Sequence, residues 1–221
     1  MVKMLWGIGR IVSIGFIMVS LLASDGIAES ALSGFNPENL QAFLFSIRGE
    51  ESVQSRKHES VRTAEGMSDD EVRLYRMIMD HRRNHGQSSI PVSPSLSRVA
   101  KMHVRDLEAH PPSGYCNLHS WSAYGPWKSF CYSGSEKAEC MFSKPRELTG
   151  YSGNGYEIVA WTSGRMLPDH ALELWEGSST HDSVIVNAGD WEGLRWRAVG
   201  LAISGSYAVV WFGEESDYAK R

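Results

Sequence analysis

The residues of this chain that could perform chemistry lie in three short polar segments. They are His119 in the segment NLHSW, Glu157 in NGYEI and His181 in SSTH. Neutral imidazoles bind metals such as zinc at about 2.0–2.1 Å. A carboxylate beside an imidazole can orient the ring, or can take a proton from a metal-bound water. These residue types therefore indicate metal or acid–base chemistry, if the fold brings them together.

No local motif supplies such chemistry by itself. The chain has no H-E-x-x-H, G-x-S-x-G, P-loop, G-x-G-x-x-G or C-x-x-C pattern. A catalytic site would therefore have to be assembled from distant residues. The residues alone favour a simpler interpretation, in which His119 and His181 are structural histidines hydrogen-bonded to Glu157.

The other histidines give no comparable signal. His103 falls on the apolar face of an expected helix, which predicts a packed core residue and not a ligand. His81, His85 and His110 lie near expected helix ends and are predicted to be solvated. His119 and Ser120 are adjacent in sequence, so they are a poor base and nucleophile pair.

The elements that must position these residues are helices first and strands late, which favours a helix-and-sheet sandwich. A capping box at Ser68–Glu71 starts the first helix, and Pro111 ends the second. The later apolar runs meet at Gly205 and predict a hairpin. The expected elements are helices at 69–84, 95–110 and 168–175, a buried segment at 156–161, a short irregular or helical turn at 178–185, and strands at 199–204 and 207–212.

A long Gly/Ser-rich segment, 113–155, contains all three cysteines, and a loop of this length is usually functional or tied by a disulfide. Three pairings are open among Cys116, Cys131 and Cys140. Cys131–Cys140 is favoured because both residues lie in one polar stretch. The aromatic residues here form either a small packed cluster or a rim for an apolar or sugar ligand: Trp121, Tyr124, Trp127, Phe130 and Tyr132.

The N-terminus has the order of a secretory signal peptide. Lys3 and Arg10 precede an apolar run at 11–23, and the small residues Gly26 and Ala28 follow it. The run is short for a membrane span, which needs about 20 apolar residues. We therefore expect cleavage after Ala28 and a secreted mature chain that does not span the membrane, with an uncleaved anchor and a buried helix as the alternatives.

Composition limits the partners. The 22 Lys and Arg residues against 26 Asp and Glu residues give a net charge of -4. Nucleic-acid binding through a basic surface needs an excess of clustered cations, so no nucleic-acid partner is expected.

The order of the three polar segments, with the closing Trp211-Phe212-Gly213, resembles the CAP superfamily (cysteine-rich secretory proteins, antigen 5 and pathogenesis-related 1), also called SCP domains. The resemblance covers roughly Glu71 to Asp217 and is closest to bacterial members. It implies an α+β fold, a three-layer α-β-α sandwich of CAP type. The implied organisation is a signal peptide at 1–28, an N-terminal helix and flexible linker at 29–67, a CAP/SCP-like domain at 68–217 and a tail at 218–221.

The resemblance also implies that His119, Glu157 and His181 line one cleft, with His119 and His181 as ligands for a divalent metal, zinc. The family's second glutamate is replaced by Ser178, so the metal-binding set is incomplete and modest affinity is expected. The leading hypothesis is a secreted binding or interaction module for a small apolar, lipid-like or protein ligand. The alternatives are a metal-assisted hydrolase with Glu157 as general base, and an envelope protein in which these residues only pack.

Overall fold

A three-stranded antiparallel sheet forms the centre of the fold. The computed structural model describes residues 66–134 and 137–217. The strands β1 (Tyr156–Trp161), β2 (Ala198–Ser204) and β3 (Tyr207–Gly213) stand in the order β1-β3-β2. The predicted hairpin is confirmed, and its turn places Gly205 at φ +50°, a conformation that favours glycine.

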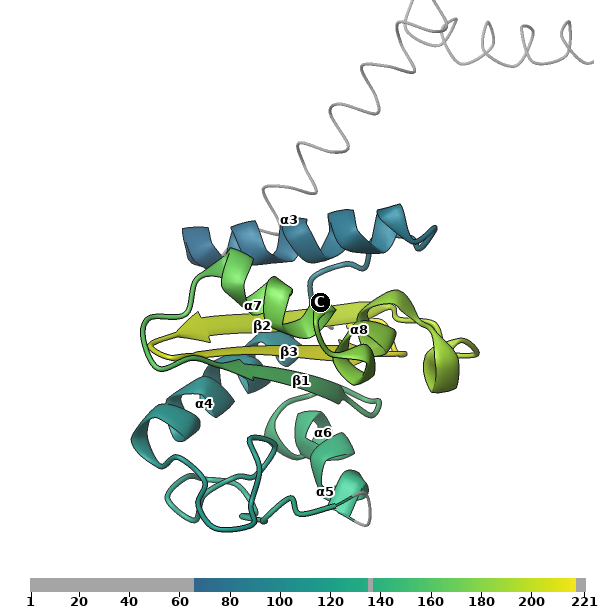
Figure 1. Cartoon of the computed structure of the whole chain (residues 1–221). Helices are drawn as coiled ribbons and strands as arrows, with labels where there is room; N and C mark the ends of the chain where they lie inside the picture. Colours follow the sequence, from purple (N-terminus) through teal and green to yellow (C-terminus); the bar gives the residue numbers. More distant parts are fainter. Residues whose placement is uncertain (1–65, 135–136, 218–221) are drawn as a thin grey trace, which may run out of the picture. The chain divides into compact units, whose positions relative to one another are not determined.

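Helices cover both faces of this sheet (Figure 1). One layer consists of α3 (Asp69–Asn84), α7 (Pro168–Glu176) and α8 (Ser179–Val186), and the other contains α4 (Pro94–Ala109), α5 (Ala138–Phe142) and α6 (Lys144–Leu148). The predicted α+β class and the three-layer α-β-α arrangement are therefore confirmed.

Each face of the sheet has its own apolar core. Alternate strand residues such as Ile158 and Val210 pack against α3, α7 and α8. Their neighbours Val159 and Val209 pack against α4. Because both faces are covered, all seven residues of β3 are buried, which explains why the strands appear in the sequence as apolar runs without polar alternation.

Local signals fix the first two helices. Ser68 accepts a hydrogen bond from the Glu71 amide, and Glu71 accepts one from the Ser68 amide, which confirms the capping box. The second helix begins one residue earlier than predicted, at Pro94, because Ser93 caps it and accepts from the Leu96 amide at 2.9 Å. Proline at the first helical position loses no intrahelical hydrogen bond.

The segment 113–155 is more ordered than a plain loop. It contains α5 and α6, which the sequence analysis did not predict. The polar run Lys144–Glu147 belongs to α6, and Lys144 is only 1% exposed. The predicted helical turn near 178–185 is a regular helix, α8.

The described residues belong to one compact unit, Val61–Arg221. The predicted signal peptide, the N-terminal helix and almost all of the linker lie outside the described residues. Within the described ranges, no helix has the length and apolar character needed to cross a membrane.

Candidate functional site

The three predicted site residues come from distant segments. His119 lies in the loop that follows α4, Glu157 is the second residue of β1, and His181 lies in the first turn of α8. Nδ1 of His119 lies 2.8 Å from Oε2 of Glu157. Among the described residues, no hydrogen bond joins His181 to either of them. Burial lowers the pKa of His181, and the nearby charge of His119 lowers it further, so a neutral imidazole is favoured there.

Glu157 accepts a second hydrogen bond that the sequence did not predict. Nδ1 of His103, in α4, lies 2.5 Å from Oε1 of Glu157, and both side chains are fully buried. The predicted burial of His103 is confirmed, but its pairing with Glu157 was missed. The available signal was that a buried histidine and a buried carboxylate each need a partner.

The hydrogen bonds of His103 fix its protonation. Its Nδ1 faces the carboxylate of Glu157, and its Nε2 lies 3.0 Å from the Ser120 carbonyl. An ionised carboxylate and a carbonyl only accept hydrogen bonds, so both ring nitrogens must carry hydrogen and His103 is an imidazolium. Its ring stacks on Trp121, with centroids 4.2 Å apart and planes 6° apart, which places a cation over an aromatic face.

The two histidines also keep Glu157 ionised. Burial raises the pKa of its carboxyl group, but the charge of His103 and the hydrogen bonds from His103 and His119 outweigh that effect. The pKa of Glu157 therefore lies below its ordinary value. Both carboxylate oxygens are engaged, and Nε2 of His119 is left as the ring atom that can contact a ligand.

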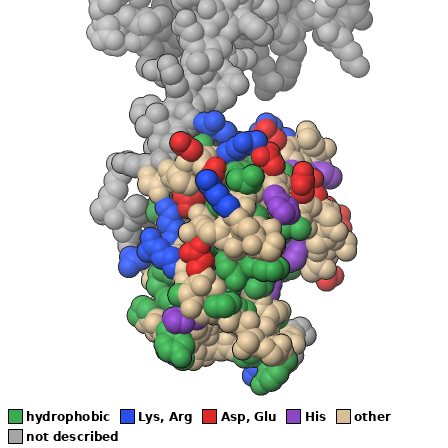
Figure 2. Space-filling view, turned by 60° about the vertical axis from the view of Figure 1, so that its left-hand side comes forward, with side chains coloured by type: hydrophobic (Ala, Val, Ile, Leu, Met, Phe, Trp, Pro, Cys, Tyr) green, Lys and Arg blue, Asp and Glu red, His purple; other side chains and the backbone are tan. Residues whose placement is uncertain are grey.

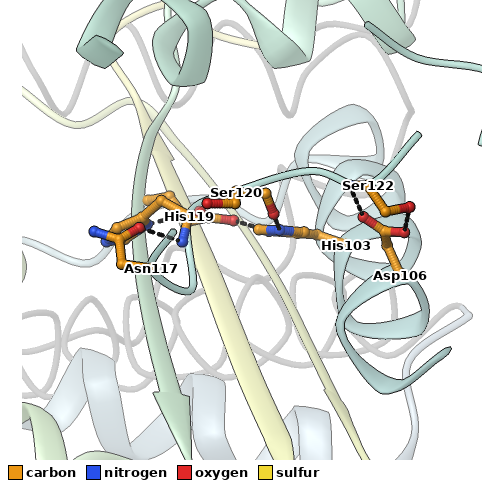
Figure 3. A network of polar contacts seen from close by, with 7 residues as sticks. His103, Asp106, Asn117, His119, Ser120 and Ser122 are labelled. Carbon is orange, nitrogen blue, oxygen red and sulfur yellow. Dashed lines mark hydrogen bonds and ion pairs between the residues drawn. The ribbon is translucent and has the colours of Figure 1, made fainter. Parts of the chain in front are cut away.

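The loop that carries His119 is held in place on both sides of the ring (Figure 3). The Asn117 side chain accepts from the His119 amide at 2.9 Å. Beyond His103, the carboxylate of Asp106 accepts from the Ser122 amide at 2.8 Å. These contacts tie the loop to α4 at Ser120 and at Ser122, and they hold the ring of His119 against Glu157.

The disulfide is not the one favoured from the sequence. Cys116 pairs with Cys131, and Cys140 is an exposed free cysteine. The Trp121–Phe130 bridge folds the loop back on itself, and this brings Cys116 beside Cys131. Cys140 lies on α5 instead, so a shared polar stretch was the wrong criterion.

A buried lysine organises the aromatic part of this loop. Nζ of Lys144 lies 5.4 Å from the ring centroids of Trp121 and Phe130. It also donates to the Lys128 carbonyl at 2.5 Å and to Glu147 at 2.8 Å. Burial lowers the pKa of Lys144, and Glu147 partly offsets that shift.

A groove of about 520 Å³ runs beside the disulfide, lined in part by His110, Pro112, Tyr124 and Phe130. The ring of Tyr124, 78% exposed, stacks on His110 at 4.1 Å. Hydrophobic side chains gather at the lower end of the molecule in Figure 2, at the height of this loop in Figure 1. Its lining is mixed, because aromatic and proline side chains stand there beside four serines: Ser113, Ser120, Ser122 and Ser129.

The three predicted site residues offer few ligands for a metal. Among the described residues, no group of three or more His, Cys, Asp or Glu side chains could hold a metal ion. His119 and His181 remain as a pair of imidazoles, and Glu157 orients the first of them.

Comparisons with known proteins gave structural matches only. No protein-family model matches the chain, and no curated protein does. A cysteine-rich secretory protein from Staphylococcus aureus matches with 12% identity over 69% of this chain and 41% of its own, at a TM-score of 0.45. An extracellular protein containing an SCP domain, from Bacillus anthracis, matches with 12% identity over 66% of this chain and 40% of its own, at 0.47.

An outer surface protein from Borrelia burgdorferi matches with 14% identity over 65% of this chain and 90% of its own, at a TM-score of 0.44. The chain spans about two fifths of the length of the Staphylococcus and Bacillus proteins.

Proposed function

We propose that the chain is an extracellular CAP-type domain that acts as a binding module, with His119 and His181 as the ligand-contacting residues of its cleft. The proposal rests on the contacts of Glu157. Its carboxylate is buried, and it accepts hydrogen bonds from two imidazoles. Glu157 is then a positioning residue, because it sets the ring of His119 and contacts no ligand itself.

This geometry favours binding over turnover. A general base must reach the proton that it removes. The side chain of Glu157 has no exposed surface, and each of its oxygens already accepts a hydrogen bond. Releasing it for proton transfer would leave the buried His103 cation without its partner, which is costly. The hydrolase alternative would need a base other than Glu157.

The extracellular location is supported by two features of the chain. The N-terminal sequence has the order of a signal peptide. The Cys116–Cys131 disulfide is of a kind that persists in oxidising compartments and is rare in the cytosol. The aromatic groove beside the disulfide offers apolar surface for a small apolar, lipid-like or protein ligand.

A divalent metal fits the cleft as a weakly bound component. The Nε2 atom of His119 and the neutral ring of His181 would hold it, and it would supply an electrophilic contact for a ligand's oxygen. With two protein ligands we expect modest affinity. That affinity falls as the pH drops, because protonated imidazoles do not bind metals.

Zinc titration by calorimetry tests the metal-binding part of this proposal. The full exported chain is compared with His119→Ala and His181→Ala, and with His110→Ala as a control at an exposed histidine outside the cleft. We expect about one equivalent of zinc in the parent and the control, and none in the two cleft variants. Equal binding by all four chains would place the metal elsewhere. No binding by the parent would remove the metal from the proposal.

A further inference from the structure

His81 joins three helices on the opposite face of the sheet from His103. The sequence predicted a solvated side chain, but His81 is only 14% exposed. Its Nδ1 lies 2.8 Å from Glu176, the last residue of α7, and its Nε2 lies 2.7 Å from Asp182, in the first turn of α8. One imidazole on α3 therefore connects the two sides of the short α7–α8 turn.

This arrangement requires a protonated ring. Ionised carboxylates only accept hydrogen bonds, so His81 must donate from both nitrogens, and only the imidazolium can do that. The C-terminal end of a helix disfavours a negative charge, whereas the N-terminal end favours one. Glu176 is thus poorly placed without a neighbouring cation, and it depends on His81 more than Asp182 does.

The first turn of α8 also carries His181, the residue directly before Asp182. The other end of this helix is held separately, because Arg82 donates to the Ile185 carbonyl and, at 2.8 Å, to the Asn187 side chain. Burial lowers the pKa of Arg82 to about 10, so this contact keeps its charge at neutral pH. An imidazole ordinarily titrates much nearer to neutral pH than a guanidinium does. Of the His81 and Arg82 contacts with α8, the His81 contact, at the end that carries His181, is therefore the one expected to respond to pH.

We propose that His81 is a pH-dependent clamp, which holds the α7–α8 turn and therefore His181 in place when it is protonated and releases them when it is neutral. A neutral imidazole donates from one nitrogen only, so one of the two carboxylates must lose its hydrogen bond. The proposal concerns regulation of the proposed cleft, and its importance rests on that proposed function.

Among the described residues, two carboxylates form ion pairs with the ring. Glu176 faces it from α7 and Asp182 from α8. On its own helix, the ring of His85 lies 4.5 Å away, and Nδ1 of His85 contacts the His81 carbonyl at 2.9 Å. His85 is exposed and contacts neither carboxylate, so it provides a matched control.

Hydrogen exchange of the full chain without added metal tests the clamp. Protection factors, corrected for intrinsic exchange, are measured for the α8 amides at about pH 5.5 and about pH 8, on either side of an imidazole's ordinary pKa of about 6.5. The chains are the parent, His81→Gln and His85→Gln. We expect protection in the parent to fall about tenfold or more at the higher pH, as the loss of one charge-assisted hydrogen bond implies.

His81→Gln should show the low protection at both pH values, and His85→Gln should behave as the parent. Parent protection that does not change with pH overturns the proposal, and so does full protection in His81→Gln. If His81→Gln does not fold, the test uses the pH dependence of the parent and of Asp182→Asn. Asp182→Asn should show a smaller change in α8 protection with pH than the parent does. Zinc titration is a separate measurement, so a clamp without metal binding and metal binding without a clamp are distinguishable.

Discussion

Replacing Glu157 by glutamine tests whether this carboxylate is the structural centre of the cleft. The substitution keeps the shape of the side chain and removes its charge. The amide has one oxygen to accept a hydrogen bond, whereas Glu157 accepts from His103 and His119. The amide nitrogen must face one of two ring N–H groups, and the fully buried His103 loses its counter-ion.

The expected cost is large. Removing one partner of a buried ion pair costs about 3–5 kcal/mol. For a domain of this size, about 1 kcal/mol corresponds to about 2–4 °C in Tm, so Tm should fall by roughly 6–20 °C. His119→Ala should cost only about 1 kcal/mol, because this ring is 18% exposed and its loss leaves Glu157 paired with His103.

Urea denaturation followed by tryptophan fluorescence measures the unfolding free energy lost in Glu157→Gln and in His119→Ala. The double variant His103→Leu/Glu157→Leu is the informative control. It removes both charges from the interior and leaves apolar side chains, so it should be more stable than Glu157→Gln alone.

The pH dependence gives a second check. The folded-state pKa of Glu157 lies below its ordinary value, so its stabilisation is present above the unfolded-state pKa of about 4.3 and is lost as the pH falls through the folded-state pKa. The stability gap between the parent and Glu157→Gln should therefore close in acid. A cost below about 1 kcal/mol at neutral pH, or a gap that persists in acid, would refute the buried ion pair.

Four further substitutions test the scaffold by denaturation. Gly200→Ala should destabilise by about 3 kcal/mol, because a Cβ there would lie 2.1 Å from a backbone nitrogen of α4; parent-like stability would contradict that close approach. Cys116→Ser should cost about 3 kcal/mol, since it opens a 15-residue loop closed by Cys131, whereas Cys140→Ser should stay within about 0.5 kcal/mol. Arg82→Met should cost about 3 kcal/mol, because it leaves buried acceptors without a donor.

The parts of the fold predicted from the sequence are those fixed by neighbours in the chain. The capping box at Ser68 involves residues three apart, and the hairpin at Gly205 joins adjacent strands. Periodicity placed His103 in the core because it depends only on the helix that carries it. None of these predictions depends on contacts between distant parts of the chain.

The parts that were missed depend on contacts across the chain. His103 and Glu157 are separated by 54 residues, and His81 and Asp182 by 101. No pattern in a single sequence predicts a contact between residues so far apart. The disulfide prediction was wrong for a similar reason, because the pairing of Cys116 depends on how the loop folds back at Trp121.

Buried charges position the irregular segments of this protein. His103 holds the carbonyl of Ser120 beside the cleft, Lys144 holds that of Lys128 in the aromatic loop, and Arg82 holds a carbonyl of α8. Apolar side chains of similar size would often give equal stability. They could not fix where a backbone oxygen lies, because apolar packing is not directional. These hydrogen-bonded charges therefore contribute precision of placement more than free energy, so a variant that keeps its stability can still lose the geometry of His119.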